Sequence, residues 1–225
     1  TSDIKTLEIG SILPLTGDGA VYGVPLQKVI KKAVDDVNLK WKDKKMQLKI
    51  HYEDGKCNGK DALTAAQTLV NLKGRKVILG GLCSGETLGA APFAETNKIV
   101  MLSMASTSPK VTNAGDYIFR NVGSDAYQAV VAANNMKKLK LSKVAILSEN
   151  TDYAQDLRKK FKEVFSGTIV ADEVINSNEK DVRTQILKIK AKNPDVLFFI
   201  PQTIPMASIF VKQAYEGGLD KITWF

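Results

Sequence analysis

The segment Gly80–Thr87, GGLCSGET, has much of the pattern of a phosphate-binding loop and directly follows an apolar run. Such a loop needs Gly, four residues, Gly, then Lys and Ser or Thr, because the lysine and the loop N–H groups hold the phosphates. Gly80, Gly85 and Thr87 fit this spacing, but Glu86 stands in place of the lysine. A carboxylate would repel phosphates, so the loop is predicted not to bind a polyphosphate.

Ser84 lies just before a predicted helix over roughly residues 86–97. Its hydroxyl and the free N–H groups of the helix start would form a site for a small anion such as a carboxylate. Leu82, at the start of the same loop, is also a candidate ligand-binding residue. The alternative is that Ser84 only caps the helix.

A second polar loop is MASTSPKVT, Met104–Thr112, which also follows a predicted strand. Ala105, Ser106 and Thr107 would add backbone groups and hydroxyls to the same pocket. The alternative is a polar turn that ends at Pro109.

Two tyrosines and a glutamine are further candidates. Tyr22 ends the loop TGDGAVYG, whose glycine spacing, G-x-G-x-x-x-G, does not fit a dinucleotide-binding loop. Tyr22 would form a pocket wall, and the alternative is an ordinary half-buried tyrosine. Tyr153 and Gln202 fall in loops that follow strands in the second half of the chain.

The elements that position these residues alternate between strand-like and helix-like patterns. Strands are predicted at 7–13, 46–52, 77–81, 99–102, 117–119, 144–147, 168–174, 196–200 and 222–225. Helices are predicted between them, at 26–37, 62–70, 86–97, 126–139, 157–165, 182–189 and 206–215.

Strands such as VLFFI and VAIL are apolar throughout, which is typical of parallel strands covered by helices on both faces. The pattern therefore predicts an α/β fold with doubly wound parallel sheets. It restarts after about residue 120, so we expect two lobes, 1–120 and 121–225, with a ligand cleft between them. The chain ends at Phe225 inside a predicted strand, so we expect truncation at the C-terminus.

Cys57 and Cys83 are the two cysteines of the chain. Both fall in loops at the carboxyl ends of predicted strands, on the same edge of the sheet, so a bridge between them is sterically allowed. It would close a loop of about 27 residues and contribute roughly 3–4 kcal/mol in the chain-entropy estimate. A disulfide would imply an exported protein, whereas two small buried thiols would not.

Composition and charge argue against several classes of function. The net charge is +8, but the basic residues are spread along the chain without interleaved aromatic residues, so no nucleic-acid partner is expected. No apolar run reaches about 18 residues, the length of a membrane-spanning helix. The chain begins at Thr1 without Met or a leader, as a processed chain would.

An enzyme is not expected. The single histidine, His51, lies within a predicted strand, and neither a Ser-His-Asp order nor a G-x-S-x-G elbow is present. The spacing of the cysteines and the histidine indicates no zinc site, and no cofactor is predicted. Asp35 and Asp36 fall on the polar face of a helix and are interpreted as solvated.

Six segments in order resemble a known family. They are IGSILPLTGDGAVYG, YEDGKCNGKDA, GGLCSGET, SMASTSP, FRNVGSD and SENTDYAQ. The chain resembles the type I periplasmic binding proteins of ABC importers, in particular the leucine/isoleucine/valine-binding branch. The resemblance implies two hinged lobes that close on a small ligand, and a disulfide between Cys57 and Cys83.

The resemblance also implies roles for individual residues. Ser84 and Thr107 match residues that hold the carboxylate of a bound amino acid. The carbonyl of Ala105 and the Thr107 hydroxyl match groups that hold its ammonium. Tyr22 and Tyr153 match aromatic residues that line the side-chain pocket.

Two departures from the family pattern affect the expected ligand. Gln202 replaces a pocket tyrosine, so a polar amino acid or another small carboxylate or amide becomes an alternative to an aliphatic amino acid. The acidic residue that pairs with the ligand ammonium would lie just past Phe225.

The resemblance implies a monomer that delivers its ligand to the membrane subunits of an ABC importer, in the periplasm or outside the cell, free or lipid-anchored. The alternative is a ligand-binding sensory domain of a receptor or regulator with the same fold.

Overall fold

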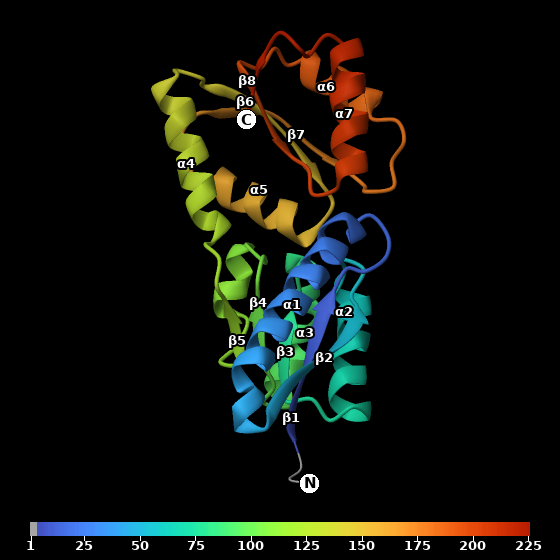
Figure 1. Cartoon of the computed structure of the whole chain (residues 1–225). Coiled ribbons are helices and arrows are strands. Elements are labelled where there is room, and N and C mark those ends of the chain that lie inside the picture. The colour runs from blue at the N-terminus through green and yellow to red at the C-terminus, as the bar shows by residue number, and fades with distance from the viewer. Residues whose placement is uncertain (1–3) are drawn as a thin grey trace. The chain divides into compact units, whose positions relative to one another are not determined.

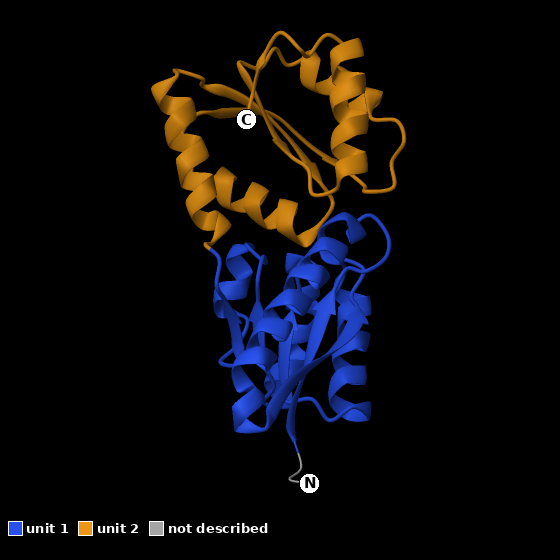
Figure 2. Ribbon diagram, viewed as in Figure 1, with its two compact units in different colours: residues 1–122 blue, residues 123–225 orange. Residues whose placement is uncertain are grey.

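The computed structural model describes residues 4–225, so the chain start at Thr1 lies outside the described residues. The chain divides into two compact units, Thr1–Val122 and Gly123–Phe225 (Figure 2). Each is an α/β unit built on its own parallel sheet.

The first unit contains a five-stranded sheet in the order β2-β1-β3-β4-β5, in which all pairings are parallel (Figure 1). Its strands are β1 (Lys5–Leu13), β2 (Met46–Asp54), β3 (Val77–Gly80), β4 (Val100–Ser103) and β5 (Ile118–Arg120). Its helices are α1 (Ala20–Trp41), α2 (Gly59–Gln67) and α3 (Ser84–Thr96), with short helical turns η1 (Lys42–Lys44), η2 (Thr68–Leu72) and η3 (Pro109–Asn113).

Helices cover both faces of this sheet. On one face, Ile12, Ile78 and Met101 pack in one buried cluster with the alanines of α2 and α3. On the other face, Leu13 packs with Ile30 of α1 and with partly buried residues of β2 and β3. Alternate residues of a strand point to opposite faces, so adjacent Ile12 and Leu13 enter different clusters.

Helices α2 and α3 approach each other closely at Gly59 and Gly89. A Cβ atom added at Gly89 would lie 2.3 Å from the Cα of Gly59, far inside van der Waals contact. The backbones therefore touch where α2 begins. A side chain at Gly89 would push the two helices apart.

The second unit contains a four-stranded parallel sheet in the order β7-β6-β8-β9. Its strands are β6 (Lys143–Glu149), β7 (Thr168–Ile175), β8 (Val196–Ile200) and β9 (Thr223–Trp224), and its helices are α4 (Asp125–Lys138), α5 (Asp152–Val164), α6 (Arg183–Lys190) and α7 (Ile204–Glu216). Val144 and Ile146 of β6 join one cluster with α4 and α5, and Ala145 and Leu147 join another with α6 and α7.

The predicted fold class is confirmed: two parallel sheets are each covered by helices on both faces, and every predicted strand and helix is present. The ends of several elements differ from the prediction. Helix α1 begins at Ala20, before the apolar stripe, and continues through Pro25. Helix α2 begins at Gly59, where the side chain of Asn58 caps it by accepting a hydrogen bond from the N–H of Asp61.

The contact between Gly59 and Gly89 leads to a prediction about stability. Replacing Gly89 by Ala should lower the free energy of unfolding by about 1–3 kcal/mol, because backbone atoms cannot yield to the new methyl group. Gly123→Ala is the matched control, since an added Cβ there meets no atom within 4 Å. Equal denaturant midpoints for the two variants would contradict the prediction.

Candidate functional site

The carboxyl ends of parallel strands meet at one edge of a sheet, where α/β proteins bind their ligands. In the first unit, four loops meet there: 14–19 after β1, 55–58 after β2, 81–83 after β3 and 104–108 after β4. The predicted ligand residues of this unit lie in these loops or in the helical turns that follow them. We call this edge the ligand edge.

The glycine-rich loop at the ligand edge holds a carboxylate of its own chain. The Glu86 side chain is 0% exposed. Its Oε2 accepts hydrogen bonds from the N–H groups of Leu82 at 2.8 Å and Cys83 at 3.0 Å, and its Oε1 accepts one from Cys57 at 3.0 Å. Burial raises the pKa of the Glu86 carboxyl, and the three hydrogen bonds offset part of that rise. These N–H groups are therefore already used inside the protein, which the sequence did not predict.

Two glycines, which lack side chains, make room for the Glu86 side chain. A Cβ at Gly55 would lie 2.4 Å from Oε1 of Glu86, and a Cβ at Gly81 would lie 2.3 Å from its Cβ. Gly55, in the loop after β2, and Gly81, in the glycine-rich loop, therefore leave room for the glutamate side chain.

The predicted disulfide between Cys57 and Cys83 is confirmed, with a Cα–Cα distance of 5.2 Å. It joins the same two loops as the Glu86 carboxylate. Lys56 and Cys57 have φ angles of 48° and 60°, in the left-handed region, which costs a non-glycine residue of order 1–3 kcal/mol. The disulfide and the hydrogen bond to Glu86 hold this turn in place.

Asp54, at the end of β2, fastens the same turn to the loop after β1. Its Oδ1 accepts hydrogen bonds from the N–H groups of Leu15 at 2.8 Å and Lys56 at 3.0 Å. Burial alone would raise the pKa of Asp54, but hydrogen bonds from Thr16, Leu15 and Lys56 outweigh it and hold the pKa below its usual range.

Ser84 is the first residue of α3, and Cys83 is the N-cap residue. The alternative in which Ser84 only caps the helix is therefore wrong. The side chain is 2% exposed, and its Oγ accepts a hydrogen bond from the N–H of Ser108 at 3.2 Å. This contact joins the start of α3 to the loop after β4.

The other candidates of the 104–108 loop differ in exposure. Ser106 is 0% exposed, and its Oγ lies 2.7 Å from Oγ1 of Thr87 and donates to the carbonyl of Leu82 at 3.2 Å. Its hydroxyl thus has partners within the unit. Ala105 is exposed and Thr107 is half-buried, so these two lie nearer the surface of the ligand edge.

Arg120, at the end of β5, is hydrogen-bonded to the main chain of the 104–108 loop. Its Nη1 donates to the carbonyls of Ser106 at 3.3 Å and Ser108 at 2.8 Å, and its Nη2 donates to Oγ1 of Thr112 at 2.6 Å. This role of Arg120 was not predicted from the sequence, although the residue lies in the segment FRNVGSD. The missed Asp54 likewise lies in the quoted segment YEDGKCNGKDA.

Tyr22 and Leu82 complete the candidates of the first unit. Tyr22 is 41% exposed and lies in the first turn of α1. That turn follows Gly19, where an added Cβ would lie 2.9 Å from the Cβ of Cys57, so it begins beside the disulfide. Leu82 is 8% exposed and packs with Leu13, while its N–H binds Glu86.

The second unit uses a similar arrangement at the carboxyl end of its own sheet. Glu149, the last residue of β6, is 0% exposed. Its Oε2 accepts hydrogen bonds from the N–H groups of Gln202 at 2.6 Å and Thr203 at 2.8 Å, and its Oε1 accepts one from the Thr203 hydroxyl at 2.9 Å. Gln202 and Tyr153 are both half-buried, and Tyr153 packs against the apolar cluster of α4 and α5.

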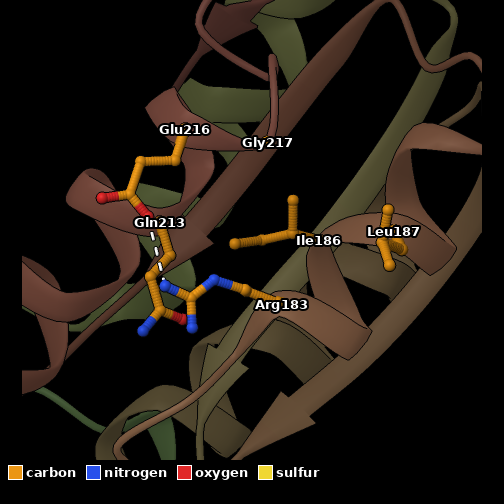
Figure 3. A pocket seen from close by; sticks show the side chains of 6 residues that line it. All are labelled: Arg183, Ile186, Leu187, Gln213, Glu216 and Gly217. Carbon is orange, nitrogen blue, oxygen red and sulfur yellow. Dashed lines mark hydrogen bonds and ion pairs between the residues drawn. The ribbon is translucent and has the colours of Figure 1, made fainter.

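A surface pocket lies between α6 and α7 (Figure 3). It is lined by Arg183, Ile186, Leu187, Gln213, Glu216 and Gly217, and its volume of ≈ 140 Å³ is small for a ligand site. Arg183 already pairs with Glu216 at 3.2 Å, as the dashed line in Figure 3 shows. The pocket is therefore not the candidate site.

The other residues considered for chemistry, His51, Asp35 and Asp36, all lie close to charged side chains of the same unit. His51 lies in β2 within 3.3 Å of Glu8. Asp35 and Asp36 are exposed and pair with lysines one helical turn earlier, which confirms that they are solvated. Within residues 4–225, no cluster of three or more metal-ligand side chains is found, and no helix has the length and apolar character needed to cross a bilayer.

Comparison with known proteins identifies the family. The sequence pattern of the periplasmic binding proteins matches residues 6–225. The chain therefore belongs to the periplasmic binding protein family. This member is 30% identical over 222 residues to the Leu/Ile/Val-binding protein of Escherichia coli K12, a match that covers 96% of this chain and 59% of that protein. The chain thus spans about three fifths of the length of such relatives.

Solved structures of other binding proteins share the fold. The branched-chain amino acid transporter substrate binding protein LivJ from Streptococcus pneumoniae, in complex with isoleucine, is 30% identical with a TM-score of 0.85, covering 96% of this chain and 63% of that one. A solute binding protein from Rhodopseudomonas palustris in complex with 4-hydroxybenzoate is 22% identical with a TM-score of 0.83, covering 98% and 61%.

The disulfide generates a prediction about thermal stability. Reduction, or Cys57→Ser with Cys83→Ser, should lower the free energy of unfolding by roughly 3–4 kcal/mol, because the bridge closes a long loop in the unfolded chain. Calorimetry with and without reductant measures the effect, and the double variant is the control because reductant should not change it. An unchanged melting temperature after complete reduction would contradict the prediction.

The lowered pKa of Asp54 leads to a prediction about acid stability. The stabilisation from Asp54 is complete above the unfolded pKa of about 3.9 and is lost as the pH falls through the lower folded pKa. Asp54→Asn should therefore be less stable than the wild type near neutral pH, and the difference should shrink as the solution is acidified. Melting temperatures across the acid range test this, and a constant difference would argue against it.

Proposed function

We propose that the protein is the extracytoplasmic solute-binding component of an ABC importer and that it binds an amino acid or a similar small carboxylate. The observation that carries the proposal is the 30% identity to the Escherichia coli Leu/Ile/Val-binding protein across 96% of this chain. The chain's own disulfide supports a location outside the cytoplasm, because disulfides persist in oxidising compartments.

The chemistry of the ligand edge supports a carboxylate ligand. The Ser84 hydroxyl accepts the N–H of Ser108, so its own proton can be donated to a ligand oxygen. We assign the ligand carboxylate to Ser84 and Thr107, and the ligand ammonium to the carbonyl of Ala105 and the Thr107 hydroxyl. Carbonyl acceptors and hydroxyl donors then lie side by side, as an amino-acid zwitterion requires.

The other candidate residues are assigned to the part of the ligand beyond its carboxylate and ammonium groups. We assign Tyr22, Tyr153 and Gln202 to contacts with the ligand side chain, with Leu82 and Ser106 supporting the ligand edge. The side-chain amide of Gln202 favours a ligand with a polar group. A carboxylate is common to the ligands named for the similar structures, isoleucine and 4-hydroxybenzoate, so it is the part of the ligand that we propose for this protein.

A thermal-shift screen tests the proposal on the full-length protein. All L-amino acids are tested first, then amides and short carboxylates, because a ligand that binds only the folded form raises the melting temperature. A shift with Leu, Ile or Val would support the branched-chain assignment, and a shift only with polar ligands would assign specificity to Gln202. No shift with any of these compounds would contradict the proposed ligand class.

A single substitution tests the site assignment. Thr107→Val should weaken binding of the ligand from that screen by more than tenfold, about 1.4 kcal/mol, because the valine lacks the hydroxyl that we assign to the ligand. Titration calorimetry measures the dissociation constant. Thr96→Val is the matched control, since Thr96 lies at the other end of α3 and bonds the carbonyl of Pro92. Equal affinities for the two variants would refute the role of Thr107.

A further inference from the structure

The Glu86 carboxylate is the buried acidic group at the ligand edge that has no role in the proposed ligand contacts. Removing a carboxylate from water is costly unless hydrogen bonds compensate it. Here three N–H groups from two loops do so, and two glycines make room for it. An apolar side chain would fill the same space without that cost, so the carboxylate is expected to do something that packing alone would not.

Glu86 and two of its hydrogen-bond donors flank Ser84 along the chain. Leu82 and Cys83, which directly precede Ser84, donate their N–H groups to Oε2. Glu86 itself lies two residues after Ser84 in the first turn of α3. The backbone of Ser84 is therefore fixed from both sides by one side chain.

The same carboxylate also couples the neighbouring loops. Its Oε1 holds the N–H of Cys57, whose side chain is bonded to Cys83. The carbonyl of Leu82 accepts the hydroxyl of Ser106, so both polar groups of the Leu82 main chain are fixed. The loops that carry Ser84 and Thr107 are thus connected through Leu82.

The geometry points to Glu86 as a positioning residue for the ligand carboxylate, an inference that rests on the proposed function. Glu86 takes up the N–H groups of residues 82 and 83, which would otherwise form an anion site of their own. The ligand carboxylate is thereby directed to the hydroxyls of Ser84 and Thr107, and the start of α3 keeps one position whether or not ligand is bound.

The test compares two glutamates of one helix. A glutamine at position 86 has a single acceptor oxygen, and its NH₂ group cannot accept, so at least one of the three N–H groups loses its partner. Glu95, near the other end of α3, accepts the N–H groups of Asp116 and Tyr117 at 3.0 and 2.6 Å. Glu95→Gln is therefore a matched change in the same helix, away from the ligand edge.

We expect Glu86→Gln to raise the dissociation constant at least tenfold, and Glu95→Gln to leave it within about twofold, while both variants lower the melting temperature. An unchanged dissociation constant in Glu86→Gln would reduce Glu86 to a structural role and overturn the inference. Failure of the wild type to bind any carboxylate would instead overturn the proposed function and this inference with it.

A second measurement uses the wild-type protein and does not depend on the folding of a variant. Amide proton chemical shifts of Leu82, Cys83 and Cys57 report their hydrogen bonds to the carboxylate. We expect these chemical shifts to be downfield without ligand and to stay nearly unchanged with ligand, while the amide signals of Ser84 and Thr107 move. Large ligand-induced changes at Leu82 and Cys83 would show that the ligand takes those donors, and would overturn the assignment.

Discussion

The arrangement of the loops in the first unit depends on the buried carboxylate of Glu86. Its two oxygens are out of contact with water, so they must accept hydrogen bonds from the protein. Three N–H groups from the loops after β2 and β3 meet this requirement. The glycines at 55 and 81 and the left-handed turn at Lys56 and Cys57 follow from it, because they bring the donors within reach. The disulfide then fixes the two loops covalently.

Buried or half-buried carboxylates recur at the carboxyl ends of strands in both units. Asp54 holds the loop after β1, and Glu149 holds the loop after β8 through the N–H groups of Gln202 and Thr203. Helix starts and loop amides at such an edge ordinarily attract anionic ligands. Here several of the loop amides bind side chains of the same chain, so the proposed contacts with the ligand carboxylate are made by hydroxyl groups instead.

The fold could be predicted from the sequence because its pattern is local. Continuous apolar strands such as Val196–Ile200 indicate burial on both faces, and adjacent residues of β6 do enter the two clusters. The disulfide between Cys57 and Cys83 was sterically allowed because their loops share a sheet edge, and the family resemblance implied it. The role of Glu86 could not be predicted, because its donors include Cys57, 29 residues away along the chain, and the pattern showed only a missing lysine. Arg120 was missed for the same reason, since the carbonyls it binds are brought to it by tertiary structure.

The contact of Gly59 with Gly89 has a consequence for how this protein can vary. Because the α2 and α3 backbones touch at these glycines, main-chain atoms set how closely the two helices approach there. The buried alanines of α2 and α3 are small as well, so a larger residue at one of them would also disturb the packing of the two helices. The contact therefore makes Gly89 a position where even a methyl group is expected to be poorly tolerated, although its role is neither chemical nor ligand-binding.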